Sequence, residues 1–340
     1  MFDTDDGHHN DYFPGGFSCC KITIKARFAL KKTSKDIPLN PLEAEIAVAA
    51  LHASGDFKVL RKMNLDADTR FTRRSVSNSR IGICIDTETT GLNHAVDKII
   101  EVGIVAFEYD PVTADIIRIT DRYSGFEDPG TALSDETTAI TGITDDMVRG
   151  HSFNDEHVDR FASQATMVIA HNAGFDRKFV ETRFPSFSRL PWACTVNQIN
   201  WQEERITTRV LEYLLFKFGR FINAHRALND AEGVLGILLE KLPVSNTPAF
   251  KALLDNYEQA TSKICAVGAP FDKKDTLKER GYRWSDGSQG SCKAWWVSVA
   301  SDLEKDELAW LASEIYSGGS TNNVEISRVS AVDRFSVRER

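Results

Sequence analysis

Two carboxylates stand two residues apart at the end of an apolar run. The stretch ICIDTETTGL, residues 83–92, alternates Ile83 and Ile85 with small residues and then reaches Asp86 and Glu88. This alternation predicts a short, mostly buried strand, and residues two apart on a strand project from the same face. Two negative charges would then lie side by side, partly out of water. For a single Asp-x-Glu, an ion pair or a turn cap is the ordinary explanation.

Two later segments carry further candidate residues. The segment IAHNAGFD ends a strand and leads to Asp176 in the first turn of a helix. The segment AHRALNDA places His225 five residues before Asp230, at the start of an amphipathic helix. Taken singly, His171 or His225 could cap a helix, and Asp230 could lie on a solvated face. Taken together, acids at a strand end and at two helix starts can converge at the carboxyl edge of one sheet, where α/β proteins place their sites.

Three Asp and one Glu gathered in one place cannot all stay ionised without a cation. The set offers only oxygen ligands and no thiolate, which favours Mg²⁺ or Mn²⁺ over zinc. Two such ions about 3.5–4 Å apart stabilise both the attacking and the leaving oxygen of an in-line displacement at phosphorus. The pattern therefore predicts a two-metal site for phosphodiester chemistry.

The motifs DTETTG, HNAGFD and HRALNDA, in this order and at these separations, resemble the three exonuclease motifs of the DEDDh superfamily. That superfamily includes the proofreading (epsilon) subunit of bacterial DNA polymerase III and RNase T. The resemblance covers roughly residues 80–242. It implies an RNase H-like α/β fold, a mixed sheet flanked by helices, and 3′-to-5′ hydrolysis of terminal nucleotides.

The resemblance also implies a role for each matching residue. Asp86 would bridge both metal ions, Glu88 and Asp230 would complete the tighter site, and Asp176 would hold the second ion, partly through water. His225 would be the general base that takes a proton from the attacking water, a task that suits an imidazole with its unperturbed pKa of about 6.5. The five-residue gap between His225 and Asp230 matches the histidine subclass.

Further residues are candidates for binding the terminal nucleotide. The segment SDETTAITGIT resembles the family segment that lines this nucleotide, which implies that Glu136 bonds the terminal sugar hydroxyl with Thr141 alongside. Helix N-terminal charge and turn packing would explain the same two residues without a substrate. The nucleotide pocket would be shaped by Asn172 and by the loop residues Thr89, Gly91 and Leu92.

The elements that must position these residues follow a simple order, in which strands come first and helices then alternate with strands. Residues 98–110 and 114–126 are β-rich runs joined near Pro111, which predicts a hairpin. Short helical turns at 134–148 follow, capped by Ser134. Helices are expected at 153–164, 174–184, 209–219 and 226–242, with a buried strand at 166–170. This order favours a mixed α/β sheet flanked by helices.

Composition shifts divide the chain into segments. We expect a disordered tail at 1–38, a basic helix and linker at 39–79, the exonuclease domain at 80–242, a connecting helix at 243–262, a small aromatic-rich α+β module at 263–316 and a loose tail at 317–340. The first helix should begin at the cap Asn40 and stop at Gly55, and the connecting helix should be capped by Thr247.

The module at 263–316 resembles one attached to some bacterial exonucleases. Trp295 and Trp296 are adjacent on a predicted strand and should face opposite sides, so one can join the core while the other faces outward. An outward Trp close to Lys273, Lys278 and neighbouring basic residues could stack a base. It could equally cover a neighbouring domain.

Charge and cysteine content limit the classes of protein to which this chain can belong. The formal net charge is −8, yet residues 21–80 hold thirteen Lys or Arg against six Asp or Glu, a net of +7. This basic stretch is either a solvated tail or an arm that attracts phosphate. No apolar run spans a membrane and the N-terminus lacks a secretory signal. Six cysteines without a CxxC predict neither a disulfide framework nor a zinc site, which favours the cytoplasm.

The expected partner is the 3′ end of a nucleic acid, with DNA favoured over RNA. Any proofreading or repair would serve a DNA polymerase in trans, because no polymerase domain is visible in the sequence. Two alternatives remain open at this point. One is an RNase T-like exoribonuclease, and the other is a catalytically silent nucleic-acid-binding protein on the same fold.

Overall fold

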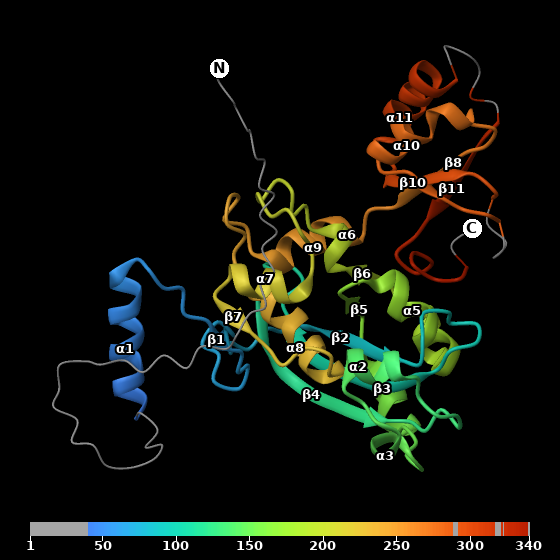
Figure 1. Cartoon of the computed structure of the whole chain (residues 1–340). Helices are drawn as coiled ribbons and strands as arrows, with labels where there is room; N and C mark the ends of the chain where they lie inside the picture. Colours follow the sequence, from blue (N-terminus) through green and yellow to red (C-terminus); the bar gives the residue numbers. More distant parts are fainter. Residues whose placement is uncertain (1–39, 288–291, 317–320, 322, 339–340) are drawn as a thin grey trace, which may run out of the picture. The chain divides into compact units, whose positions relative to one another are not determined.

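The protein is described by a computed structural model that covers residues 40–287, 292–316, 321 and 323–338 (Figure 1). The chain divides into two structural units, one that ends at Phe57 and one that starts at Lys58. The tail expected at 1–38 lies outside the described residues. In the first unit, α1 (Pro41–Ser54) has the predicted capping box between Asn40 and Glu43 and stops at Gly55, so this prediction is confirmed.

A five-stranded mixed sheet forms the centre of the second unit. Its order is β4-β3-β2-β5-β6, with β2 at Arg80–Thr89, β3 at Ile99–Tyr109, β4 at Ile116–Phe126, β5 at Met167–Ala170 and β6 at Trp192–Cys194. The first three strands are antiparallel, which confirms the predicted hairpin, and β5 and β6 run parallel to β2. The predicted fold class, a mixed α/β sheet flanked by helices, is confirmed.

Helices cover both faces of this sheet (Figure 1). On one face Cys84 and Val105 pack with residues of α7, α8 and α9, and on the other Ile83 and Ile104 pack with residues of α4 and α5. The elements are α2 (Asp135–Thr141), α3 (Asp145–Val148), α4 (Asp155–Gln164), α5 (Ala173–Arg183), η1 (Pro185–Arg189), α6 (Thr195–Gln198), α7 (Leu211–Lys217), β7 (Arg220–Phe221), α8 (Ala227–Leu238) and α9 (Ala249–Tyr257). Apolar residues on both faces of the central strands explain why they are buried on both sides.

The helix expected to connect two domains belongs to the core around the five-stranded sheet. The side chain of Phe250 in α9 is fully buried, and its ring packs edge-on against Phe107 at 5.5 Å and Tyr109 at 5.1 Å between ring centroids. The predicted cap is wrong, since α9 follows Pro248 and has no side-chain cap from Thr247. The apolar side of this helix was visible in the sequence, but its partners on β3 lie about 140 residues away and were not.

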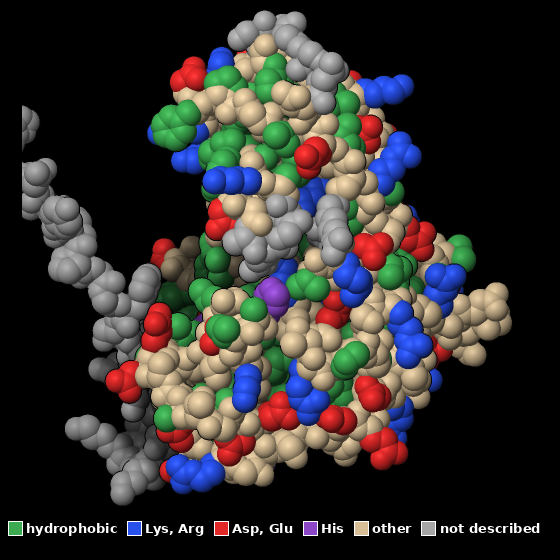
Figure 2. Space-filling view, turned by 90° about the vertical axis from the view of Figure 1, so that its right-hand side faces the viewer, with side chains coloured by type: hydrophobic (Ala, Val, Ile, Leu, Met, Phe, Trp, Pro, Cys, Tyr) green, Lys and Arg blue, Asp and Glu red, His purple; other side chains and the backbone are tan. Residues whose placement is uncertain are grey.

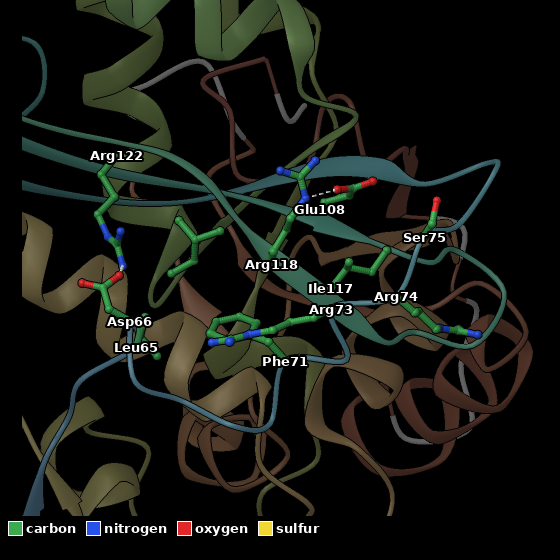
Figure 3. A pocket seen from close by; sticks show the side chains of 11 residues that line it. Leu65, Asp66, Phe71, Arg73, Arg74, Ser75, Glu108, Ile117, Arg118 and Arg122 are labelled. Atoms are coloured by element: carbon green, nitrogen blue, oxygen red, sulfur yellow. Dashed lines mark hydrogen bonds and ion pairs between the residues drawn. The ribbon is translucent and has the colours of Figure 1, made fainter.

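The segment expected to be a linker packs along the edge of the sheet. Residues 61–62 form β1 (Arg61–Lys62), which pairs with β7, and Phe71 is buried. The amides of Thr72 and Arg73 donate to the carbonyls of Ile116 and Ile117, each at 3.1 Å. Edge strands expose unpaired backbone groups, and this segment covers part of that edge. Beside it lies a hollow of about 590 Å³ in which Arg118 pairs with Glu108 and Arg122 with Asp66 (Figure 3).

The C-terminal module is a four-stranded antiparallel sheet, with helices packed on one face. The strand order is β11-β8-β10-β9, with β8 at Thr261–Ala266, β9 at Arg283–Trp284, β10 at Trp295–Ala300 and β11 at Val324–Val329. The helical elements are η2 (Phe271–Lys273), α10 (Lys274–Glu279), α11 (Glu304–Trp310) and η3 (Leu311–Ile315). The predicted strand–helix–hairpin–helix order is confirmed.

The loose tail expected at 317–340 is wrong wherever its residues are described. β11 pairs with all six residues of β8. Beyond it, residues 330–338, here called the C-terminal strap, lie against the domain that contains the five-stranded sheet. The buried guanidinium of Arg177 donates to the carbonyls of Val332 and Arg334, and the amide of Trp192 donates to the carbonyl of Ala331. These acceptors are more than 130 residues away along the chain, so local sequence patterns could not reveal them.

One disulfide forms, although the cysteine pattern predicted no disulfide framework. Cys265 on β8 and Cys292 form a disulfide, with 6.8 Å between their Cα atoms. Among the described residues, Cys84 and Cys194 are free and buried. Cys265 and Cys292 are 27 residues apart and meet only because β8 pairs with β10. No helix in the described part of the chain is both long and apolar enough to cross a membrane.

Candidate active site

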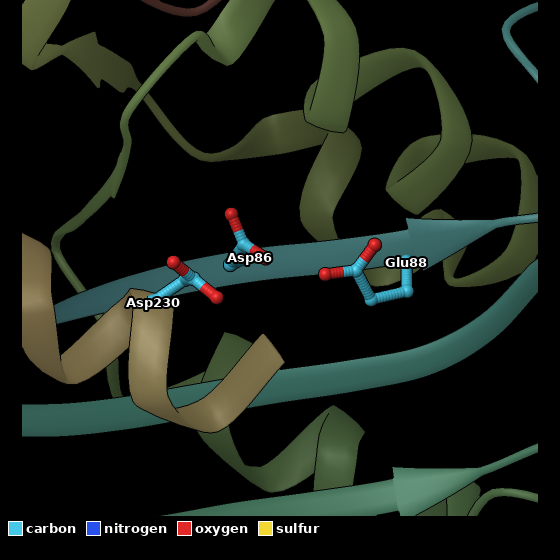
Figure 4. Close-up of side chains that lie close together, drawn as sticks. All are labelled: Asp86, Glu88 and Asp230. Atoms are coloured by element: carbon cyan, nitrogen blue, oxygen red, sulfur yellow. The ribbon is translucent and has the colours of Figure 1, made fainter. Parts of the chain in front are cut away.

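Three carboxylates from two elements meet at the end of the central strand. Asp86 and Glu88 project from one face of β2, as their spacing predicts, and Asp230 comes from the first turn of α8 (Figure 4). One oxygen from each of these three side chains lies within 4.8 Å of the other two. We call these three residues the acid cluster. The structure thus brings together three of the four predicted acidic ligands in one compact group.

A glycine on the neighbouring strand allows α8 to approach this closely. Gly103 on β3 lies directly opposite Asp86, so a side chain there would share its face. A Cβ atom added at Gly103 would lie 2.1 Å from the backbone nitrogen of Leu228 and 2.2 Å from the carbonyl carbon of Ala227. Such distances are excluded for real atoms. Only glycine therefore lets the first turn of α8 rest on the sheet and deliver Asp230 to the acid cluster.

The fourth acid, Asp176, lies beside the cluster rather than within the compact group. Its carboxylate accepts hydrogen bonds from the amide of Thr87 at 3.1 Å and from the hydroxyl of the same residue at 2.9 Å. Asp176 belongs to the first turn of α5 and is 4% exposed. Thr87 separates Asp86 from Glu88 on β2, so Asp176 reaches the strand between the two acids. Its charge is close enough to act on Asp86.

Burial raises the pKa of all four acids, and repulsion between them adds to the shift of Asp86, Glu88 and Asp176. The pKa of Asp86 lies well above its usual range, because burial disfavours its charge and the carboxylates of Asp176 and Asp230 repel it. Burial, and next the charge of Asp230, raises the pKa of Glu88 to about 8. Burial raises the pKa of Asp176 to about 7 and that of Asp230 to about 6, although hydrogen bonds oppose both shifts. Without a cation, some of these four acids therefore stay protonated at neutral pH, whereas a bound cation would favour the ionised form of all four.

The two candidate histidines lie in different environments. His225 is exposed and takes a left-handed backbone conformation with φ 62°, two residues before α8. The pKa of Asp230 is raised by burial, and it is lowered in part by the charge of His225, which places the two residues close together. The two ring nitrogens of His171 instead contact the Thr195 hydroxyl at 2.7 Å and the Arg209 carbonyl at 2.6 Å. Burial lowers the pKa of His171 to about 4.

One functional residue was missed in the sequence. Glu101 on β3 lies opposite Glu88 and is only 1% exposed. Its carboxylate accepts hydrogen bonds from the guanidinium of Arg226, at 3.0 Å, and from the amide of Ala227, at 3.2 Å. Glu101 thereby anchors the start of α8, and its charge adds to the repulsion on Glu88. A charged residue inside the apolar run KIIEVGIVAF was the available signal, since such residues are almost never fully buried without a partner.

The loop after β2 is tied to α2. The Thr137 hydroxyl donates to the carbonyl of Thr90 at 3.1 Å, and the Thr89 hydroxyl donates to the carbonyl of Gly91 at 2.6 Å. Leu92 is 86% exposed and lines a hollow of about 190 Å³. The structure thus places α2, which carries Glu136 and Thr141, next to the loop Thr89–Leu92.

The other candidate substrate-binding residues differ in what their side chains contact. Glu136 is exposed in the first turn of α2. The buried Thr141 hydroxyl donates to the carbonyl of Thr137 at 2.8 Å, the turn-packing contact that was the alternative to substrate binding. Asn172 is exposed before α5 with φ 148°, a conformation uncommon outside glycine, and its side chain makes no capping hydrogen bond. No substrate contact is assigned to these three residues from geometry.

Comparison with known proteins identifies the family. The sequence profile of the family described as Exonuclease (RNase_T) matches residues 83–238. A DNA polymerase III epsilon subunit from Treponema pallidum is 31% identical over 155 residues, which cover 43% of this chain and 69% of that protein. A PolC-type DNA polymerase III from Listeria monocytogenes is 41% identical over 158 residues, 46% of this chain. The chain spans only about 10% of the length of that polymerase.

A solved structure of exonuclease X in complex with 5′-overhanging duplex DNA is also similar. It shares 25% identity with this chain, with a TM-score of 0.40, and the match covers 52% of this chain and 99% of exonuclease X. The family match and the acids at the edge of the mixed sheet define the class, which is a hydrolytic exonuclease. The chain belongs to the DEDDh exonuclease family, which includes the DNA polymerase III epsilon subunit.

Proposed function

We propose that this protein removes nucleotides one at a time from the 3′ end of DNA by metal-dependent hydrolysis. The observation that carries the proposal is the acid cluster, with one oxygen each of Asp86, Glu88 and Asp230 within 4.8 Å of the other two. Nothing in the folding of β2 or α8 requires these charges to lie together. Their repulsion raises the free energy of the folded protein, so the arrangement indicates a ligand that offsets it.

The residues fit a divalent cation of the hard type. All donors are carboxylate oxygens without a sulfur ligand among them, the set that Mg²⁺ and Mn²⁺ prefer. We propose that Asp86, Glu88, Asp176 and Asp230 hold two such ions. When bound, the ions polarise the phosphodiester and make a water molecule a better nucleophile. His225 is exposed and close enough to act on the charge of Asp230, and it would take the proton of that water as a general base.

The relatives support DNA as the substrate. The epsilon subunit and the PolC-type enzymes both belong to DNA polymerase III by name. We therefore propose that the protein acts on DNA 3′ ends, in proofreading or repair, and that it serves a polymerase in trans in the cytoplasm. The loop Thr89–Leu92, together with Glu136, Thr141 and Asn172, would surround the terminal nucleotide.

One assay tests this proposal. End-labelled single-stranded DNA, duplex DNA and RNA of the same sequence are incubated at equal concentration with the full chain, in Mg²⁺ and in EDTA. We expect stepwise shortening from the 3′ end of DNA in Mg²⁺, none in EDTA and none with Asp86→Asn. Faster shortening of RNA would assign an exoribonuclease instead. Binding without any shortening would show a silent nucleic-acid-binding protein.

A further inference from the structure

A second hollow, away from the acid cluster, lies between the exonuclease domain and the C-terminal module. It has a volume of about 900 Å³, and we call it the basic cleft. We propose that the basic cleft binds the single-stranded segment of nucleic acid that leads to the 3′ end. This inference rests on the proposed function, because it names the path by which the substrate of that function enters. Three observations support it.

The first observation is charge. None of the described residues that line the cleft is an Asp or Glu, although the whole chain has 49 of these and a net charge of −8. Five basic residues line it: Lys178, Arg209 and Arg283 are at least partly exposed, whereas Lys263 and Arg334 are buried. On the face drawn in Figure 2, by contrast, acidic and basic side chains are interspersed. A surface with basic groups and no acids attracts the phosphate backbone of a strand.

The second observation is an aromatic platform inside the cleft. Trp296 on β10 lines it and is partly buried. The ammonium of Lys263 lies 5.2 Å, and the guanidinium of Arg283 5.8 Å, from the centroid of a Trp296 ring. The ring can stack a base while the exposed guanidinium of Arg283 contacts an adjacent phosphate. Proteins that bind single strands without sequence preference combine these two features.

The third observation is continuity with the nucleotide-binding loop. The smaller hollow lined by Leu92 shares Gly174, Phe175 and Lys178 with the basic cleft. Gly174 and Phe175 belong to the same turn of α5 as Asp176. A strand that lies in the cleft therefore continues past α5 to the loop after β2, where its 3′ end would meet the acid cluster.

The opposite face of the module provides matched controls. Trp284 lies directly across from Trp295, so both face away from Trp296. The expectation that Lys278 lies close to the outward Trp is wrong, since Lys278 lies near Trp295, which packs with the core of the module. Trp284 is 53% exposed, so the module offers an aromatic and a basic residue outside the cleft. Trp284→Ala and Lys278→Ala remove the same types of side chain from the same module as Trp296→Ala and Arg283→Ala.

Binding is measured with the full chain in EDTA, so that the result does not depend on hydrolysis. The probe is a fluorescent single-stranded oligonucleotide of about 20 nucleotides, longer than the ~4–16 nucleotides that one single-strand-binding fold covers. We expect Trp296→Ala to weaken binding by about 5- to 150-fold. We expect Arg283→Ala to reduce the slope of log affinity against log salt by about 0.7. The variants Trp284→Ala and Lys278→Ala should bind as the unchanged protein does.

Two results would overturn the inference. One is equal weakening by Trp284→Ala and Trp296→Ala, and the other is unchanged binding and salt slope in Arg283→Ala, an exposed position where folding is not at stake. Thermal melting identifies a Trp296→Ala protein that is unfolded, and Trp296→Phe, which keeps a stacking ring, should then restore binding. If oligonucleotides bind as expected but are never shortened, the cleft stands and the proposed nuclease function fails.

Discussion

The acids at the end of β2 destabilise the metal-free protein at neutral pH. In the unfolded chain their pKa values lie near 4, whereas the folded protein raises the pKa of Glu88 to about 8 and that of Asp176 to about 7. A raised pKa in the folded state favours folding at low pH, and this contribution is lost as the pH rises through the folded value. The free energy of unfolding in EDTA should therefore fall between about pH 4 and pH 8.

Asp86→Asn is the variant that tests this repulsion. The amide keeps the shape of the side chain and removes one negative charge, so the fall of unfolding free energy with pH should become shallower. Urea unfolding at several pH values, in EDTA and in Mg²⁺, measures it. Magnesium should stabilise the unchanged protein most at the upper end of the pH range. If the unfolding free energy of the variant falls with pH as steeply as that of the parent, repulsion in the acid cluster is not the cause of this fall.

His225 and His171 are predicted to respond differently to substitution. His225→Ala should lower the turnover number by about 10²- to 10⁴-fold, the usual contribution of a general base, while substrate binding is retained. His171 uses both ring nitrogens in contacts to Thr195 and Arg209. His171→Ala should therefore lower the melting temperature and leave the turnover number of the folded protein nearly unchanged. Steady-state kinetics and thermal melting of the two variants distinguish the roles, and similar turnover losses in both would contradict them.

At the scale of elements, the position of α8 against the sheet decides whether the site forms. Gly103→Ala would place a methyl group against the backbone of Ala227 and Leu228, so α8 must shift. We expect overpacking to lower the free energy of unfolding by about 1–3 kcal/mol. We also expect weaker metal binding than in the control variant, because Asp230 moves with the helix. Gly82→Ala is the control, since its methyl would meet the Phe107 ring and not α8. Equal metal affinity in the two variants would refute this role.

The C-terminal strap satisfies a buried cation. Arg177 is fully buried, and it donates to strap carbonyls as well as to Glu181. Deletion of residues 330–340 should lower the free energy of unfolding by about 1–3 kcal/mol or more, because a buried charged donor loses acceptors. In an Arg177→Met background the same deletion should cost less, by at least about 1 kcal/mol. Urea unfolding of the parent, the deletion, Arg177→Met and the combined variant gives this difference. An equal loss of unfolding free energy in both backgrounds would show that the strap does not act through Arg177.

At the scale of the whole molecule, the sequence predicted what depends on local geometry. Asp86 and Glu88 share a face because strand residues alternate, and Asp176 reaches the same edge because α5 follows β5 of the same sheet. Asp230 depends instead on the close approach of α8 to Gly103. The partners of Glu101 and of Arg177 could not be found from local patterns. Each depends on a partner far along the chain, and a single sequence shows which residues are apolar or charged but not which distant residues they meet.

The central claim is that Asp86, Glu88, Asp176 and Asp230 hold divalent cations for hydrolysis at a nucleic-acid 3′ end. Titration of the full chain with Mn²⁺, followed by the electron paramagnetic resonance signal of the free ion, tests it most directly. We expect two bound ions for the unchanged protein, loss of both in Asp86→Asn and loss of one in Asp176→Asn. Equal Mn²⁺ binding by the unchanged protein and Asp86→Asn would contradict it.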